Sequence, residues 1–300
     1  MNAKRPSPIE RAGARRHVRG RVLDVICVAA TATTLLPLGA VLVMLLAKGI
    51  EGLSADVFTS LPPLPNATGG GFGNALLGTV IMVLIAGILA IPLGILGAIT
   101  LHELVPNSMF ANAVRFAVKV LSGIPSIIAG VLAFMIAVST AGTPNAIAGG
   151  IALSVLMLPS VMLIAEESLK QVPEHLRRAA EALGATRTQA TFLVTIPAAG
   201  SGVITGVVLG FARAIGETAP LLLTAQFAAN LWPIDESPPY LHLMRETASM
   251  PVLIFNFSGQ PFQNQVDLAW SAALMLVAMV LTLNIVGKAV ALRGRRHQRN

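Results

Sequence analysis

The chain has 300 residues, of which 54% are hydrophobic and 12% are charged, and its formal net charge is +7. About a quarter of the residues in an ordinary soluble domain are charged, so this composition favours a polytopic membrane protein over two soluble domains. Seven Lys and Arg residues lie within the first 21 positions and five within the last 13, beside long apolar segments, which argues against a nucleic-acid-binding surface. The single cysteine, Cys27, excludes a disulfide within the chain and a thiolate metal cluster.

Six segments are apolar and long enough to cross a bilayer, which requires about 20 residues of helix. They lie near residues 24–47, 74–100, 120–140, 147–165, 199–225 and 267–288. The first is longer than the core of a signal peptide, so we expect it to remain in the protein. The short turn at 141–146 predicts a hairpin between the third and fourth segments. The predicted fold class is therefore an all-α membrane protein with six transmembrane helices.

The distribution of Lys and Arg among the loops predicts that both termini are cytoplasmic. With this orientation the inward loops and tails carry eighteen Lys and Arg residues, whereas the outward loops carry only Lys48 and Arg245. The predicted organisation is a basic tail (1–23), a first transmembrane helix with an outer loop (24–72), a transmembrane domain (73–290) containing a cytoplasmic loop (166–198), and a second basic tail (291–300).

The cytoplasmic loop at 166–198 is predicted to form a short helix, a sharp turn and a second helix. Pro173 suits a first helical position, and Gly184 stands where a left-handed cap would end the first helix. Thr186 and Gln189 have the spacing of a capping box for the second. The apolar residues that share one face of the first helix are Leu176, Ala179, Ala180 and Leu183. So short a helix is marginal alone, so we expect it to dock on the membrane surface, on its own bundle or on a partner protein.

The stretch RAAEALGATRTQATFLVTIP, which ends at Pro197, resembles the EAA loop of ABC-importer permeases. In that family E-A-A is followed by three residues, a glycine, nine residues and I-x-L-P. This chain departs from the pattern at Arg178, where the family usually has Glu. The matching and conservatively exchanged positions are Ala179, Ala180, Gly184, Val194, Ile196 and Pro197. The resemblance implies that a coupling helix seats in a groove of an ATPase subunit, through Leu176, Ala179, Ala180, Leu183 and Gly184.

Two charged residues, Arg213 and Glu217, interrupt the fifth apolar segment. A helical wheel places them within one arc of about 80° together with three glycines, so we expect this face to pack against another helix, with Arg213 near the middle of the span. A charge at that depth costs about 2.5–3.5 kcal/mol on insertion scales. The pair could be purely structural, each charge neutralising the other. Alternatively, the guanidinium could bind an oxyanion while Glu217 balances it when no anion is present.

Three stretches together resemble the PstA-type permeases of high-affinity phosphate ABC importers: SGIPSIIAGV from Ser122, RAIGETAPLLLTA from Arg213, and MPVLIFNFSGQPFQNQVDLAW from Met250. The resemblance implies a type I importer bundle in the bacterial inner membrane, with Arg213, Glu217 and Thr218 lining the phosphate path. It also implies three kinds of partner: a second, PstC-like permease, PstB-like ATPase subunits that use ATP and Mg²⁺, and an extracytoplasmic PstS-like phosphate-binding protein. This chain would then be non-catalytic, with no cofactor of its own.

Three other functions stay open from the residues. The solute could be another oxyanion, such as molybdate or phosphonate. An ATPase-independent secondary transporter would be favoured by inverted repeats, which we do not find. A scaffold or sensor would tolerate neutral replacement of Arg213. The chain contains no P-loop motif, and its five histidines lack ligand spacing. His102 and Glu103 lie at a predicted membrane boundary, where we expect a surface role rather than catalysis.

Overall fold

The computed structural model describes residues 8–233 and 238–297, and this part is helical apart from connecting turns and loops. The longer helices are α1 (Pro8–Glu51), α2 (Gly73–Ile99), α3 (Met109–Gly123), α4 (Ser126–Ala133), α6 (Ala146–Lys170), α9 (Ile196–Ile215) and α13 (Gln263–His297). The shorter elements are η1 (Ala55–Phe58), α5 (Ser139–Ala141), α7 (Glu174–Ala182), α8 (Arg187–Ala190), α10 (Ala219–Thr224), α11 (Pro239–Leu243) and α12 (Met250–Ser258). Three π-helical segments are η2 (Thr100–Leu104), η3 (Phe134–Val138) and η4 (Thr191–Thr195).

Among the described residues, five helices are long and apolar enough to cross a membrane, and the bent pair of α3 and α4 is a sixth candidate. This confirms the predicted all-α class. The predicted hairpin also forms: Gly142 turns the chain in the left-handed region at φ +80° after α5, and the Asn145 side chain caps α6 by accepting a hydrogen bond from the Ala148 N–H.

The predicted third span, 120–140, is present as the bent pair of α3 and α4, and the chain breaks inside it. α3 ends at Gly123 and α4 begins at Ser126, and the two are bent by 105°. Pro125 carries no N–H for a helical hydrogen bond, and it forces Ile124 into extended backbone at φ −72° and ψ 136°. The apolar composition continues through the break, which is why hydropathy alone joined the end of α3 to α4.

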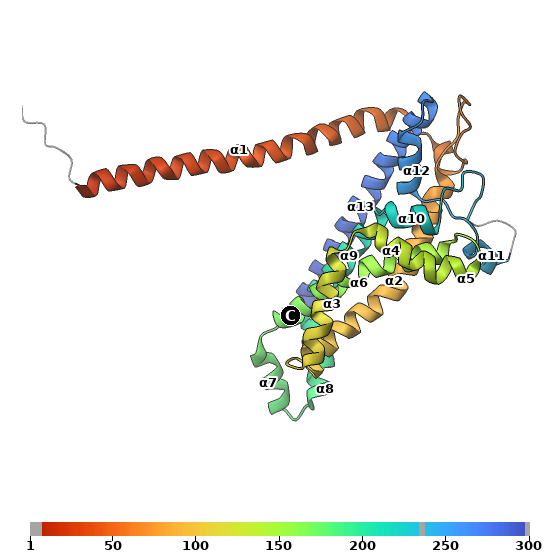
Figure 1. The fold of residues 1–300 in the computed structure, drawn as a ribbon. Coiled ribbons are helices and arrows are strands. Elements are labelled where there is room, and N and C mark those ends of the chain that lie inside the picture. Colours follow the sequence, from red (N-terminus) through yellow and green to blue (C-terminus); the bar gives the residue numbers. More distant parts are fainter. Residues whose placement is uncertain (1–7, 234–237, 298–300) are drawn as a thin grey trace, which may run out of the picture.

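The centre of the bundle is built from α2, α6 and α9, which approach closely at glycines (Figure 1). A Cβ atom at Gly94 of α2 would lie 2.9 Å from Val161 of α6. The same holds for the predicted glycine face of α9, where a Cβ at Gly210 would lie 2.9 Å from Met157 and one at Gly206 3.0 Å from Ile164. The predicted close packing of α9 is confirmed, and α6 is the helix it packs against.

The first helix, α1, lies mostly outside this bundle (Figure 1). Between Gly20 and Glu51 only Leu45 and Gly49 are buried, and their part of α1 packs against the start of α13. Lys48 Nζ lies 5.3 Å from the centroid of the Trp270 ring, a cation–π distance that ties the two helices together. The rest of the apolar surface between Gly20 and Glu51 is not covered by the described part of this chain.

Candidate functional site

Arg213 lies in the last turn of α9, and Glu217 lies in the break that follows. Arg213 Nε donates to Glu217 Oε1 across 3.4 Å, and the two side chains are 37% and 17% exposed. The C-terminus of a helix carries partial negative charge, so a cation in the last turn of α9 is favourably placed. The pair predicted from the sequence therefore exists, at a helix end.

The predicted fifth span, 199–225, is helical but interrupted after Ile215. The helix stops there, and α10 starts at Ala219 after Gly216, Glu217 and Thr218. Pro220 has no N–H with which to continue the α9 hydrogen-bond ladder, and it occupies the first turn of α10 instead. Arg213 is accordingly not near the middle of a continuous helix, and it is more exposed than the glycine face of α9 that packs on α6.

Much of the hydrogen-bonding capacity of this site is unused. Within the described residues, the Arg213 Nη groups make no hydrogen bond, and the Thr218 hydroxyl makes none either. A guanidinium offers five N–H donors in a planar fork that matches the oxygens of a phosphate or carboxylate. Arg213 and Thr218 can therefore donate to an oxyanion, in competition with Glu217 for the guanidinium.

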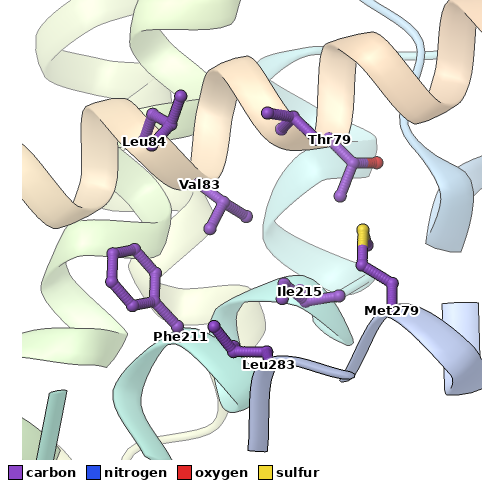
Figure 2. A pocket seen from close by; sticks show the side chains of 8 residues that line it. Thr79, Val83, Leu84, Phe211, Ile215, Met279 and Leu283 are labelled. Atoms are coloured by element: carbon purple, nitrogen blue, oxygen red, sulfur yellow. The ribbon is translucent and has the colours of Figure 1, made fainter. Parts of the chain in front are cut away.

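An apolar cavity of about 220 Å³ (Figure 2) lies on the side of α9 that faces away from Arg213. Phe211 and Ile215 point into it from α9, facing Val83 of α2 and Leu283 of α13. Residues two positions apart on a helix differ in direction by about 200°, so Arg213 points away from this cavity. Because burying an oxyanion among apolar side chains is costly, the cavity is not an anion site.

The exposed side of α9 carries further polar groups. Thr205 and Leu209 are exposed and precede Arg213 at helical spacing, so this chain leaves one stripe of α9 uncovered. Next to the stripe, a cavity of about 390 Å³ between α9 and α13 is lined by Thr205, Leu209, Asn284 and Lys288 among others. The uncovered stripe thus carries a cation at the helix end and a hydroxyl group farther along, and the cavity beside it adds an amide and an ammonium group from α13.

Two stretches that carry the resemblance pack against each other beside the site. A Cβ atom at Gly130 of α4 would lie 2.6 Å from Pro220 Cα of α10, so only glycine permits this approach. The SGIPSIIAGV stretch therefore supports the element that begins directly after Thr218.

The predicted helix–glycine–helix shape of the loop is confirmed, with a difference of one residue at its start. Pro173 precedes α7 rather than starting it, and Gly184 adopts φ +90° after the helix ends. Thr186 and Gln189 form the predicted capping box of α8: the Thr186 side chain accepts from the Gln189 N–H, and the Gln189 side chain accepts from the Thr186 N–H. α8 then continues through η4 into α9.

The apolar face of α7 is turned away from the rest of the chain. Leu183 is 91% exposed and Leu176 is 39% exposed, and α7 contains no buried residue. A charged side of α7, about 100° around the helix from Leu176, contacts the bundle through Arg177. This arrangement excludes docking of the apolar face on the chain's own bundle. Arg178, the departure from the EAA pattern, pairs with Glu174 one turn earlier, at 2.9 Å.

Replacing Gly184 by alanine tests the turn through backbone strain alone. Nothing lies within 4 Å of a Cβ at Gly184, so the substitution causes no clash. A non-glycine residue in the left-handed region costs about 1–2 kcal/mol, and we expect amide hydrogen exchange in α7 to accelerate about tenfold. Gly200→Ala is the matched control, because Gly200 is equally open but helical. Equal exchange in the two variants would contradict the strain argument.

The expected surface role of His102 and Glu103 is wrong for Glu103, whose side chain is 1% exposed. A second buried carboxylate, Glu166 at 3% side-chain exposure, accepts from Arg115 Nε at 2.7 Å and pairs with Lys170 at 3.1 Å. Arg115 also donates to the Leu101 and Pro106 carbonyl oxygens, at 2.8 and 3.0 Å. This cluster ties α3, α6 and the end of α2 together. Sequence reasoning missed it, although its charged residues border predicted spans.

Loss of the Glu166 carboxylate is expected to destabilise the protein. Removing one partner of a buried pair leaves the other charge uncompensated, so Glu166→Ala should lower the free energy of unfolding by about 3 kcal/mol. Lys170→Ala removes only the 46% exposed partner and should cost less than about 1 kcal/mol. Thermal unfolding of the purified variants in detergent distinguishes the two values. Equal losses would show that the cluster is not a buried, stabilising pair.

Similarity to known proteins agrees with this architecture. Residues 90–293 match the family described as binding-protein-dependent transport system inner membrane component. The chain is 39% identical to the phosphate transport system permease protein PstA of Yersinia pestis, over 81% of this chain and 80% of the relative. It is 38% identical to the protein of the same name from Haemophilus influenzae, over 82% of this chain and 84% of the relative.

Two solved structures share the fold. A chain of the bacterial alginate ABC transporter, in complex with alginate pentasaccharide-bound periplasmic protein, aligns with a TM-score of 0.65 and 15% identity, over 93% of this chain and 96% of that chain. A chain of the inward-facing MetNI methionine ABC transporter aligns with a TM-score of 0.57 and 19% identity, over 74% of this chain and 93% of that chain. At these identities the likeness concerns the fold alone.

The family match and the 39% identical relative, together with the membrane-spanning helical bundle, define a membrane permease of the ABC-importer type. The chain belongs to the family of binding-protein-dependent transport system inner membrane components, and the two relatives described above are phosphate permeases named PstA. It is a transport component of the inner membrane rather than an enzyme.

Proposed function

We propose that this chain carries inorganic phosphate into the cell as one permease subunit of an ATP-driven importer. The second permease is PstC-like, ATP and Mg²⁺ are used by PstB-like ATPase subunits, and phosphate is delivered by a PstS-like extracytoplasmic binding protein. Membrane lipid surrounds the assembly, both termini are cytoplasmic, and the chain itself holds no cofactor. The 39% identity to a phosphate permease over most of both chains supports the choice of solute.

The observation that carries the proposal is the unused donor set at the α9–α10 break. The Arg213 fork and the Thr218 hydroxyl are available to an oxyanion, and Glu217 already occupies one edge of the guanidinium. An arriving phosphate must displace that carboxylate, which keeps binding weak enough for release. The second permease covers the exposed stripe of α9 and completes the path.

Coupling to ATP hydrolysis is assigned to the loop that contains α7. Leu176, Ala179, Ala180 and Leu183 form the surface that seats on the ATPase subunit, and Gly184 sets the angle between α7 and α8. The exposure of this apolar face, with the charged side of α7 held on the bundle, supports the assignment. Closure of the ATPase would then move a defined element of the permease.

The test is radiolabelled phosphate uptake by cells that lack this chain, with and without its restoration. Restored uptake that is suppressed by excess unlabelled phosphate and not by molybdate or a phosphonate is the expected result. Suppression by molybdate or a phosphonate at equal concentration would assign the importer to that oxyanion. Uptake that persists when ATP hydrolysis is blocked would instead favour a secondary transporter.

A further inference from the structure

The π-helical end of α2 carries a carboxylate that is buried and surrounded by donors. Glu103 has a side-chain exposure of 1%, and its Oε1 lies 2.9 Å from His102 Nδ1. π-helical turns within α-helices are rare and frequently occur at functional sites. The conformation of η2 thus places the Glu103 carboxylate inside the protein, although the sequence predicts a surface position for it.

The second carboxylate oxygen reaches both limbs of the coupling loop. Glu103 Oε2 accepts from Arg177 Nη1 of α7 at 3.4 Å, and from the Thr191 hydroxyl of η4 at 3.2 Å. Arg177 and Thr191 lie on opposite sides of the turn at Gly184. One buried group therefore holds the helix before the glycine turn and the segment after it.

The same arginine has two other carboxylates within reach, and both are on its own helix. Arg177 lies 3.8 Å from Glu174 and 4.0 Å from Glu181, which are 59% and 42% exposed. Only Glu103 connects Arg177 to another element of the described chain. The Arg177 guanidinium thus has one buried ion pair that reaches another element, with Glu103, and two exposed ion pairs within α7, with Glu174 and Glu181.

The surroundings allow this link to transmit movement. α7 has no buried residue, and its ion pair to another element of the described chain is the one between Arg177 and Glu103. A cavity of about 230 Å³ lies beside the link, lined by His102, Glu103, Lys170, Glu174 and Arg177 among others. α2, in contrast, is packed tightly along α6, so a displacement of its end passes into the centre of the bundle.

We propose that Glu103 is a positioning residue that couples the loop to α2, so that movement of α7 on the ATPase is passed through the carboxylate to the transmembrane bundle. The proposal rests on the proposed importer function. It assigns to Glu103 a role in coupling, distinct from the anion path at Arg213 and from the apolar docking surface of α7.

The first experiment measures ATP hydrolysis and phosphate uptake separately, in vesicles that contain the complete importer. Glu103→Gln retains the shape of the side chain and removes its charge. The phosphate transported per ATP hydrolysed should fall about tenfold or more, the effect of losing one charge-assisted hydrogen bond. Glu174→Gln and Glu181→Gln remove the same charge from the exposed contacts of Arg177 and should keep the ratio within about twofold of wild type.

A double variant tests whether the carboxylate acts through the arginine. Arg177 is 26% exposed, so Arg177→Gln is tolerated by the fold and should lower the ratio as Glu103→Gln does. Combining the two substitutions should cause no further loss, because both remove one interaction. A wild-type ratio in Glu103→Gln, or an equal loss in Glu174→Gln, overturns the proposal. Should Glu103→Gln fail to assemble, a wild-type ratio in Arg177→Gln and Thr191→Val overturns it equally.

A second measurement needs no transported solute, and so separates this proposal from the choice of phosphate. Spin labels at Ala182→Cys on α7 and Leu96→Cys on α2 are introduced in a Cys27→Ser background; both label sites are exposed. The distance distribution between the labels should stay narrow with and without ATP, and should broaden when Glu103→Gln is added. A distribution that is unchanged by Glu103→Gln refutes the link, whatever solute is carried.

Discussion

Arg213→Gln is expected to reduce phosphate uptake by at least about 100-fold, because two charge-assisted hydrogen bonds to the anion, worth about 1.5–3 kcal/mol each, are lost. Glutamine is polar but shorter than arginine, and it carries neither the charge nor the five-donor fork of the guanidinium. The measurement is initial uptake in cells that lack the chain, restored with either form at equal membrane abundance. Equal uptake by the two forms would make the Arg213–Glu217 pair structural and remove Arg213 from the path.

Two neighbouring substitutions separate charge from geometry at this site. Arg213→Lys keeps the positive charge but replaces the fork by a point charge, so uptake should lie between that of wild type and that of Arg213→Gln. Glu217→Gln removes the competing carboxylate, so phosphate should bind more tightly and leave more slowly, lowering KM and the maximal rate together. A raised KM in Glu217→Gln would mean that the carboxylate orients Arg213 instead of competing for it.

Local sequence signals predicted the coupling loop well. Gly184 was expected in the left-handed region and Thr186 in a capping box, and both are found there. Each feature is decided within a few residues, by backbone freedom at glycine and by hydrogen bonds between positions three apart. The docking alternatives stayed open from the sequence, because which face of α7 meets the bundle depends on groups distant in the chain.

Hydropathy does not show where the helices break, whereas the prolines within the predicted spans favour kinks or breaks near their positions. The break before Ser126 lies in largely apolar sequence, the break after Ile215 contains Glu217 and Thr218, and each has a proline close by. A proline in an apolar span can lie inside a continuous helix, as Pro92 does in α2 and Pro159 in α6. Pro125, in contrast, lies at the break between α3 and α4. The choice depends on tertiary packing, such as the approach of Gly130 to Pro220.

The buried charged clusters could not be predicted at all from local patterns. Glu103 meets groups 74 and 88 residues away, and Arg115 meets Glu166 51 residues away. Glu103, Arg115 and Glu166 each border an apolar span, where a charged side chain is usually expected to extend to the water interface. Burial with paired donors is decided only when the helix ends come together.

Leu183→Asp is expected to abolish ATP-driven uptake while leaving this chain folded. Leu183 is 91% exposed in the isolated chain, so the substitution removes no internal contact. On the ATPase, however, the site would lose about 1.5–3 kcal/mol of apolar burial and gain an unpaired buried charge, so uptake should fall by more than about 100-fold. ATPase subunits should also fail to co-purify with the variant.

The matched control for Leu183→Asp is Ala182→Asp, which adds the same charge at the neighbouring exposed position. Successive residues on a helix point about 100° apart, so Asp at 182 lies off the docking face formed by Leu176 and Leu183. Ala182→Asp should retain ATPase binding and most uptake. Equal losses in both variants would mean that charge near the loop, and not the apolar face of α7, decides docking. Normal ATPase binding by Leu183→Asp would place the docking surface elsewhere on the chain.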